Sequence, residues 1–484
     1  MFPPATPPPS PCGAPAPATP IQQRTIRCEE NQPLVADPEL TSLSGARTAM
    51  ATAQRILGPT FDDLPWYRWW VLQQLSLQPQ RPRLCLPTND ECDDKASSAP
   101  TDAFMAVWNQ TRELILAPGP KTIESIANSL LDLGLVSAKN NYEAMQSVKD
   151  LVFSILGWQT MLYKPDFVSA EAQVPECFSI LDEMDGYHGE TRACLTQSAA
   201  YASRKPLPEF LLGFGVMLPP PNYRGFAADD DPDQQKSFAE RKRVSPKEMN
   251  AHVLKNVCGL RFCWVDSLSC HLEMDMRSGT VFLYRYPSFC AYQLRRQLDA
   301  RAEPESKQRK SLSDGHRCVL HCCAFERRSS VPWADQEDVT KLLQQVLLSY
   351  RLLFGQTKKS REVFRSLRPF ARIPPDGHDE FLTQLCGRKR PPDGCAAEIL
   401  ERDEYDLVDD FPYLRSKLVR LSSYASGKRP QSIMQLWADR RNSPAWLAFW
   451  SVLLFGSIGL FLALVQTLFQ ILQYVDAVKH SGNG

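Results

Sequence analysis

The residue types best suited to chemistry gather between positions 258 and 323 of this 484-residue chain. Zinc takes four thiolate or imidazole ligands in a tetrahedron, and this region supplies both. The metal candidates are Cys318, His321 and Cys322, with Cys270 and His271 upstream. No CxxC pair occurs, however, and the segment RCVLHCCAF could place its residues on both faces of a strand. The sequence therefore favours buried structural cysteines, with a zinc site as the alternative.

Motifs for nucleophilic, nucleotide-dependent and zinc-hydrolase chemistry are missing from the sequence. There is no GxSxG nucleophile elbow, and no GxxxxGK[ST], GxGxxG or HExxH. Acidic runs at 182–185 and 403–410 supply carboxylates, but charged turns explain them, and no partner marks an acid and a base. We assign no catalytic and no cofactor-binding residue, expect no cofactor, and lean towards a protein that is not an enzyme.

The elements that would position these residues are mostly helices, so we predict a mainly α fold with a small β element (α+β). Apolar residues recur at helical spacing over 102–116, 122–135, 142–163, 336–353 and 414–424. Alternation over 260–265 predicts a strand, and the segments 271–276 and 280–286 around a glycine turn predict a hairpin. The proline pairs in 367–394 predict irregular structure there.

Shifts in composition, including several clusters among the 39 prolines, divide the chain into regions. We expect a disordered Pro-rich N-terminus (1–59), a mainly helical region (60–217), a linker or exposed loop (218–248), an α+β region with the hairpin and a long helix (249–366), an irregular basic, Pro-rich and juxtamembrane segment (367–443), a transmembrane helix (444–475) and a short tail (476–484).

One segment near the C-terminus has the length and composition of a membrane span. No charged residue occurs from Pro444 to Val475, and Ala445–Val465 is nearly all apolar. Its 21 residues would extend about 31 Å as a helix, close to the thickness of a bilayer's hydrocarbon core. We expect one transmembrane helix that contacts the lipid bilayer through Ala445–Val465.

The charges on either side of this span predict its orientation. Only Lys479 follows it, whereas seven basic residues precede it: Arg415, Lys417, Arg420, Lys428, Arg429, Arg440 and Arg441. Because the more basic side stays cytosolic, we expect a single-pass protein with a cytosolic N-terminal body, tail-anchored to its membrane. The tail fits the endoplasmic reticulum and the mitochondrial outer membrane equally.

Residues within the span suggest helix contacts. Gly459 and Ala463 form a small-xxx-small pair, with Gly456 nearby. Three glutamines share one face: Gln466, Gln470 and Gln473. One interpretation is a homo-oligomer through the membrane helix; the one we favour places the glutamines in the headgroup region.

The charge pattern argues against a nucleic-acid partner. Formal net charge is zero, so no overall basic field attracts phosphates. A helix followed by a hairpin at 247–286 would suit a winged-helix-like unit, but the hairpin carries Glu273 and Asp275. We also find no helix with a dense lysine and arginine stripe. We therefore expect no nucleic acid.

Cysteine usage indicates the compartment. The chain has 15 cysteines, an odd number, and its N-terminus lacks the basic region and apolar stretch of a signal peptide. A reducing cytosol with free thiols is the simpler account.

Several segments, taken together and in order, resemble a group of uncharacterised filamentous-fungal proteins. They are ILAPGPKTIESIA (115–127), ILGWQTMLYKP (155–165), WVDSLSCHLEMD (264–275), YRYPSFC (284–290), LLSYRLLFGQTKKSREVF (347–364) and LWADRRNSPAWLAFWSVLLFG (436–456). They cover the chain from about Arg112 onward. The resemblance implies a membrane protein with a C-terminal span and supplies no catalytic residue.

These patterns favour a membrane-anchored, cytosol-facing protein without enzymatic activity, which acts as an interaction or scaffold protein for cytosolic proteins. One alternative is an enzyme or metal-binding protein that uses region 258–323. A weaker alternative is a membrane-tethered winged-helix-like regulator.

Overall fold

The computed structural model describes residues 64–77, 99–137, 142–166, 177–184, 186–187, 195–217, 220–223, 232–302, 318–325, 335–392, 399–428 and 443–481. The predicted disordered region 1–59 lies outside these residues. Within them the chain is mainly helical with small sheets, which confirms the predicted fold class at that level.

All five helices predicted by range in the body are present. The helices are α2 (Pro65–Leu77), α4 (Ala99–Leu116), α5 (Ile123–Asp132), α6 (Tyr142–Thr160), α8 (Ala199–Ala202), α9 (Leu207–Gly213), α10 (Pro232–Glu240), α11 (Ala251–Asn256), α12 (Pro287–Ala302), α14 (Val319–Cys322), α15 (Gln336–Tyr350), α16 (Lys358–Leu367), α17 (Glu380–Gly387), α18 (Arg415–Gly427) and α20 (Ser443–Ser481). The helices predicted over 102–116, 122–135, 142–163, 336–353 and 414–424 are confirmed as α4, α5, α6, α15 and α18.

Helix α5 illustrates how the sequence specifies these elements. Its buried side chains are Ile123, Ile126, Ala127 and Leu130, which recur every three or four residues. A capping box closes its first turn: Ser125 N donates to Thr122 Oγ1 at 2.9 Å, and Thr122 N donates to Ser125 Oγ at 3.0 Å. Periodicity and cap thus agree on where the helix begins.

The strands form three small sheets among the described residues. The strands are β1 (Cys177–Ser179), β2 (Thr196–Ser198), β3 (Arg243–Val244), β4 (Arg261–Val265), β5 (Met274–Asp275), β6 (Thr280–Tyr284) and β7 (Tyr405–Asp406). β1 pairs with β2, and β3 with β7, both antiparallel. β5 and β6 form the predicted antiparallel hairpin, with Gly279 at φ +63° in its turn.

The pairing of β4 with β6 was not predicted. The two strands run parallel, with Val265 opposite Tyr284 at their ends. Parallel strands need a long crossover connection, and here the connection includes the turn η4 (Leu268–Cys270) and strand β5. This register brings the next residue of each strand, Asp266 and Arg285, to the same end of the sheet.

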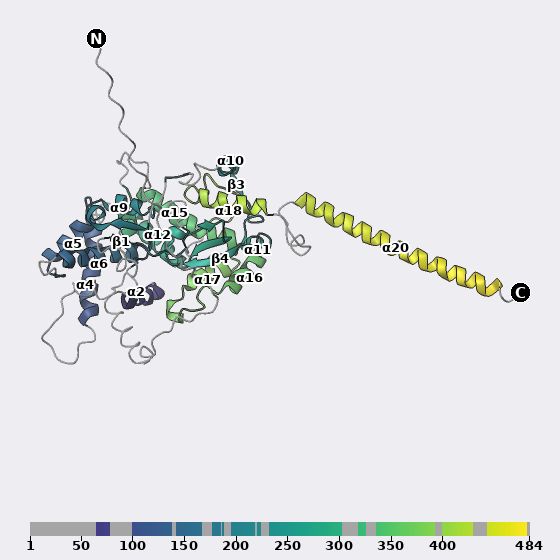
Figure 1. Cartoon of the computed structure of the whole chain (residues 1–484), viewed down its shortest axis with the longest axis horizontal. Coiled ribbons are helices and arrows are strands. Elements are labelled where there is room, and N and C mark those ends of the chain that lie inside the picture. The colour runs from purple at the N-terminus through teal and green to yellow at the C-terminus, as the bar shows by residue number, and fades with distance from the viewer. Residues whose placement is uncertain are drawn as a thin grey trace, which may run out of the picture.

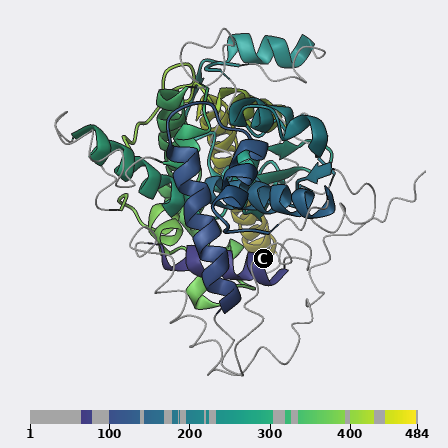
Figure 2. The ribbon, with the colours of Figure 1, turned by 90° about the vertical axis from the view of Figure 1, so that its left-hand side faces the viewer.

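One contiguous apolar core contains residues from Leu64 to Ala425. Helix α2 contributes three aromatic side chains to it, Trp66, Tyr67 and Trp70, and the Trp66 ring stacks on Tyr286 with centroids 4.0 Å apart. Tyr67 donates its hydroxyl to the Trp158 carbonyl at 2.7 Å. In Figure 2, α4 faces the viewer and α2 lies beside its lower end, consistent with the ring contact between Tyr67 and Trp108. The first described helix is therefore fixed by residues far along the chain.

Several helices lie where the sequence patterns did not predict them, and α16 and α17 show why. Helix α17 falls within 367–394, which we expected to be irregular, because Asp379 caps it after the prolines and accepts from Phe381 N at 3.0 Å. Helix α16 buries only Ser360, Val363 and Phe364. Such a narrow apolar face gives a weak periodic signal.

Helix α15 continues into a π-helical turn (Arg351–Gly355) that carries the fully buried Arg351. The Arg351 guanidinium donates to the carbonyls of Leu385 at 2.6 Å, Arg388 at 2.9 Å and Lys389 at 2.7 Å, and its Nε donates to Glu401 at 2.6 Å. The carbonyls at the end of a helix lack intrahelical partners and attract a cation. Arg351 therefore fixes the chain at the end of α17.

The last helix, α20, extends away from the body (Figure 1). The candidate span is Leu447–Asp476, 30 residues long, and its most apolar 18-residue window has a mean hydropathy of 2.3, with none of that window buried. By length and composition this helix could cross a membrane. What the structure confirms of the predicted span is one long, exposed, apolar helix.

Candidate functional site

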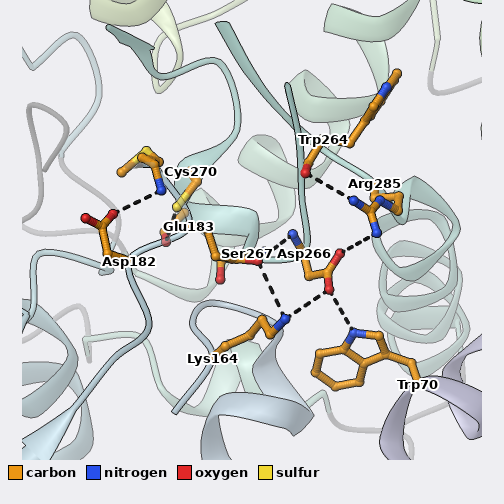
Figure 3. Close-up of polar contacts among 11 residues, drawn as sticks. Trp70, Lys164, Asp182, Glu183, Trp264, Asp266, Ser267, Cys270 and Arg285 are labelled. Atoms are coloured by element: carbon orange, nitrogen blue, oxygen red, sulfur yellow. Dashed lines mark hydrogen bonds and ion pairs between the residues drawn. The ribbon is translucent and has the colours of Figure 1, made fainter. Parts of the chain in front are cut away.

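A group of buried charges, which we call the Asp266 centre, lies at the end of strand β4 (Figure 3). Asp266 Oδ2 accepts hydrogen bonds from Trp70 Nε1 and Lys164 Nζ, each at 3.2 Å. Asp266 Oδ1 pairs with Arg285 Nη1 at 3.3 Å. Helix α2, the end of α6 and strands β4 and β6 thus meet at one carboxylate.

A second carboxylate completes the centre. Glu183 accepts from two successive backbone N–H groups, those of Asp266 at 3.0 Å and Ser267 at 2.9 Å, one with each oxygen. Its Oε1 also lies 3.8 Å from Lys164 Nζ. The centre therefore holds two carboxylates and two cations, which balance in charge.

The electrostatics keep these groups ionised. Burial alone would raise the pKa of Asp266, but the charges of Arg285 and Lys164 and the hydrogen bond from Trp70 outweigh it and hold the pKa below its ordinary value. Burial would lower the pKa of Lys164, but Glu183 and Asp266 outweigh that effect and raise it. A carboxylate paired in this way is a poor proton acceptor, so the centre is better suited to joining chain segments than to acid–base catalysis.

A second buried polar group surrounds His271 and resembles a nucleophilic triad in its residue types. Tyr284 N donates to His271 Nδ1 at 3.2 Å, so in a neutral ring the proton lies on Nε2, which donates to Ser349 Oγ at 2.8 Å. Ser349 in turn donates to the Val346 carbonyl at 2.7 Å. A general base must accept the serine proton, whereas here the histidine donates to the serine. This geometry does not activate Ser349.

The Glu273 carboxylate, two residues along the chain from His271, pairs with a lysine rather than with the histidine. Glu273 pairs with Lys417 Nζ at 3.1 Å, and the same ammonium donates to the carbonyls of Ser269 at 3.0 Å and His271 at 2.8 Å. Burial, together with the charge of Lys417, lowers the pKa of His271 well below its ordinary value. His271 is therefore neutral at physiological pH, and this group ties α18 to the β sheet.

The structure separates the two histidines among the predicted metal ligands. His271 contacts Ser349 of α15, whereas His321 contacts Thr340 of the same helix at 3.0 Å. Nine residues of helix separate these positions by about 13 Å along the axis. Two imidazoles bound to one zinc ion would each lie about 2 Å from it.

The predicted cysteine ligands are also divided. Cys318 and Cys322 lie in and beside the short helix α14 with His321. Cys270 belongs to a separate small apolar cluster with Met184, Val265 and Phe282. Within the described part of the chain, no group of three or more His, Cys, Asp or Glu side chains is placed to hold a metal ion. The zinc site stays a prediction.

Cys322 also borders a cavity of about 360 Å³. Its other lining residues are Ile115, Leu116, Ala117, Pro118, Gly119, Pro120, Lys121, Pro206, Leu207, Pro208, Glu209, Ala324, Phe325 and Gln336. Its wall exposes nearly as much polar as apolar surface, whereas small-molecule pockets are mainly apolar, and its volume is at the small end of their range.

Sequence reasoning missed the Asp266 centre, because its members are scattered between positions 70 and 285. Asp266 lies beside Arg285 because β4 and β6 pair in parallel register. That pairing is not readable from alternation alone.

Comparisons of this chain with protein-family profiles, curated proteins and solved structures found no match. The function must therefore be argued from the chemistry of this chain.

Proposed function

We propose that this chain is a single-pass membrane protein whose folded body is held in the cytosol by α20, where it acts as a non-enzymatic interaction or scaffold protein. The observation that carries the proposal is α20 itself: 39 residues long, with an apolar stretch exposed on every face. A soluble protein would have to bury a surface of that size.

The remaining flanking charges support a cytosolic body. Arg415 and Lys417 are buried in the body, and Arg420 contacts the Tyr187 hydroxyl there, so these three belong to the fold. Four basic residues remain upstream of the span, against Lys479 downstream: Lys428, Arg429, Arg440 and Arg441. The positive-inside rule still favours the body on the cytosolic side.

The two polar groups support a role without catalysis. Charges in the Asp266 centre are paired with one another. Ser349 accepts a hydrogen bond from His271 and donates to a backbone carbonyl, so the histidine does not act as its base. Both groups hold distant segments of the body together, as a rigid binding platform needs.

Alkaline carbonate extraction followed by protease protection tests the proposal. The full chain with an N-terminal tag is expected to remain in the membrane pellet, with the tag digested when protease is added outside. Leu454→Asp with Leu460→Asp places two charges in the apolar stretch and is expected to release the protein to the supernatant.

The matched control is Leu133→Asp, which changes an exposed leucine on the body and should leave the protein in the pellet. Extraction of the unmodified chain into the supernatant would refute the anchor. Protection of the tag would refute the cytosolic orientation.

A further inference from the structure

One face of the body is strongly basic although the whole chain has a net charge of zero. Residues 358–372, which include α16, contain six basic side chains and one acidic side chain, and residues 388–390 add three more basic ones. We call these two segments the basic face. Except for half-buried Arg361, the basic side chains are exposed: Lys358, Lys359, Arg365, Arg368, Arg372, Arg388, Lys389 and Arg390.

The two segments lie together. Helices α16 and α17 pack against each other, and Arg365 Nη2 donates to the Gly387 carbonyl at 3.1 Å, one residue before Arg388. The buried Arg351 holds the carbonyls of Arg388 and Lys389 from inside the body. The charges are therefore presented on a fixed surface. This corrects our sequence-based statement that no helix carries a dense lysine and arginine stripe.

Fold stability accounts for only part of these charges: Arg361 and Arg365 donate to the backbone carbonyls of Gly355 and Gly387, but they also repel each other. Arg361 and Arg365 lie four residues apart on α16, a spacing at which like charges repel. Lys358 and Lys359 occupy its first turn, where the helix dipole disfavours cations. An anionic partner would offset both costs.

The place of the basic face indicates which anionic partner. Figure 1 shows α16, and the end of α18 that leads to α20, on the side of the body nearest to α20. Residues 429–442 connect the two helices and can span at most roughly 50 Å when fully extended. A membrane that holds α20 would therefore stay within reach of this side of the body.

We propose that the basic face docks on the anionic lipid surface of the membrane in which α20 is anchored, which orients the body and leaves the opposite side open to partners. This rests on the proposed membrane anchor. Acidic headgroups attract clustered lysine and arginine over about a Debye length.

The test uses the full chain carrying Leu454→Asp and Leu460→Asp, so that insertion of α20 does not contribute. The protein is sedimented with vesicles of phosphatidylcholine alone, or of phosphatidylcholine mixed with phosphatidylserine. We expect binding to the mixed vesicles only, and its loss in high salt. Lys359→Glu with Arg390→Glu should weaken binding about tenfold or more.

The control Lys121→Glu with Lys205→Glu makes the same charge change near α5 and α8 and should leave binding unaltered. Thermal unfolding of both variants identifies any loss of folding. If the first pair misfolds, Lys358→Gln with Lys389→Gln replaces it; because this pair changes the charge by half as much, a smaller weakening, still about tenfold, is expected. Equal sedimentation with both vesicle types, or equal loss in the control, would overturn the proposal. So would binding to a short RNA duplex without binding to the mixed vesicles. Because this variant does not insert, the result is independent of the carbonate test.

Discussion

Replacing Asp266 by asparagine removes one charge from the Asp266 centre and keeps the shape of the side chain. In the variant, Lys164 Nζ would retain Glu183 at 3.8 Å, and Arg285 would retain the Trp264 carbonyl at 3.1 Å. Two cations would then share a single carboxylate in a largely buried site. The folded state should lose stability because one cation is left without a matching charge.

The size of the loss follows from burial. Removing one partner of a buried ion pair costs about 3–5 kcal/mol. The side chains of Lys164 and Arg285 are 18% and 20% exposed, so water offsets part of that cost. We expect a decrease of about 3 kcal/mol in the free energy of unfolding, a large share of the roughly 5–15 kcal/mol of a typical domain. Lys164→Met in the same chain should recover part of the loss, because it removes the orphaned cation.

Urea unfolding of the full chain in a fixed detergent, followed by tryptophan fluorescence, measures this change. Asp275→Asn is the control, since Asp275 accepts hydrogen bonds from the backbone of an exposed turn, from Arg277 N and Ser278 N. Because the pKa of Asp266 is lowered, its contribution is present above the ordinary pKa of about 4 and is lost as pH falls through the lowered value. The gap between wild type and variant should therefore narrow in acid. Equal, small losses for both substitutions would refute the structural role of the centre.

Two further predictions concern buried titratable groups. Burial raises the pKa of Asp379 to about 6, although its carboxylate accepts hydrogen bonds from Ser288 N and Phe381 N. The contribution of Asp379 to the free energy of unfolding is therefore full below about pH 4 and is lost as pH rises through 6. Asp379→Asn should reduce the fall in stability between those pH values by on the order of 3 kcal/mol, measured by urea unfolding at each pH. A decline as steep in the variant would count against this assignment. Burial raises the pKa of the Cys318 thiol to about 12, so little reactive thiolate forms at neutral pH. Mass spectrometry after alkylation should find Cys318 unmodified in the folded protein, and the half-buried Cys322 should be modified faster. The reverse order would show that α14 does not pack as described.

The predictable parts of the fold are those where a local pattern coincides with burial. Helix α5 was predictable because its buried residues recur at helical spacing and Thr122 caps it. Helix α17 was missed because the surrounding prolines outweighed the single cap at Asp379. Helix α16 was missed because it buries so few apolar side chains.

The candidate site was not predictable for a different reason. Lys164, Glu183 and Asp266 belong to segments that come together only when β4 pairs in parallel with β6 and the end of α6 packs beside them. Composition marks charged residues, but it does not indicate which of them are buried together. The cysteines and histidines attracted attention by type alone, whereas the chain places His271 and His321 on separate hydroxyls of α15.

The length of the candidate span in α20, Leu447–Asp476, has a further consequence for the membrane that would hold it. Its 30 residues correspond to about 45 Å of helix, against a hydrocarbon core of about 30 Å. To bury all of it the helix would have to tilt by nearly 50°, beyond the range of about 0–40° seen for membrane helices. The nearly all-apolar part, Ala445–Val465, matches the hydrocarbon core on its own at about 31 Å, so mismatch arises only if the polar turns beyond it are buried as well. A thick bilayer would reduce that mismatch. The turns that carry Gln466, Gln470 and Gln473 are the ones best able to leave the hydrocarbon where mismatch persists.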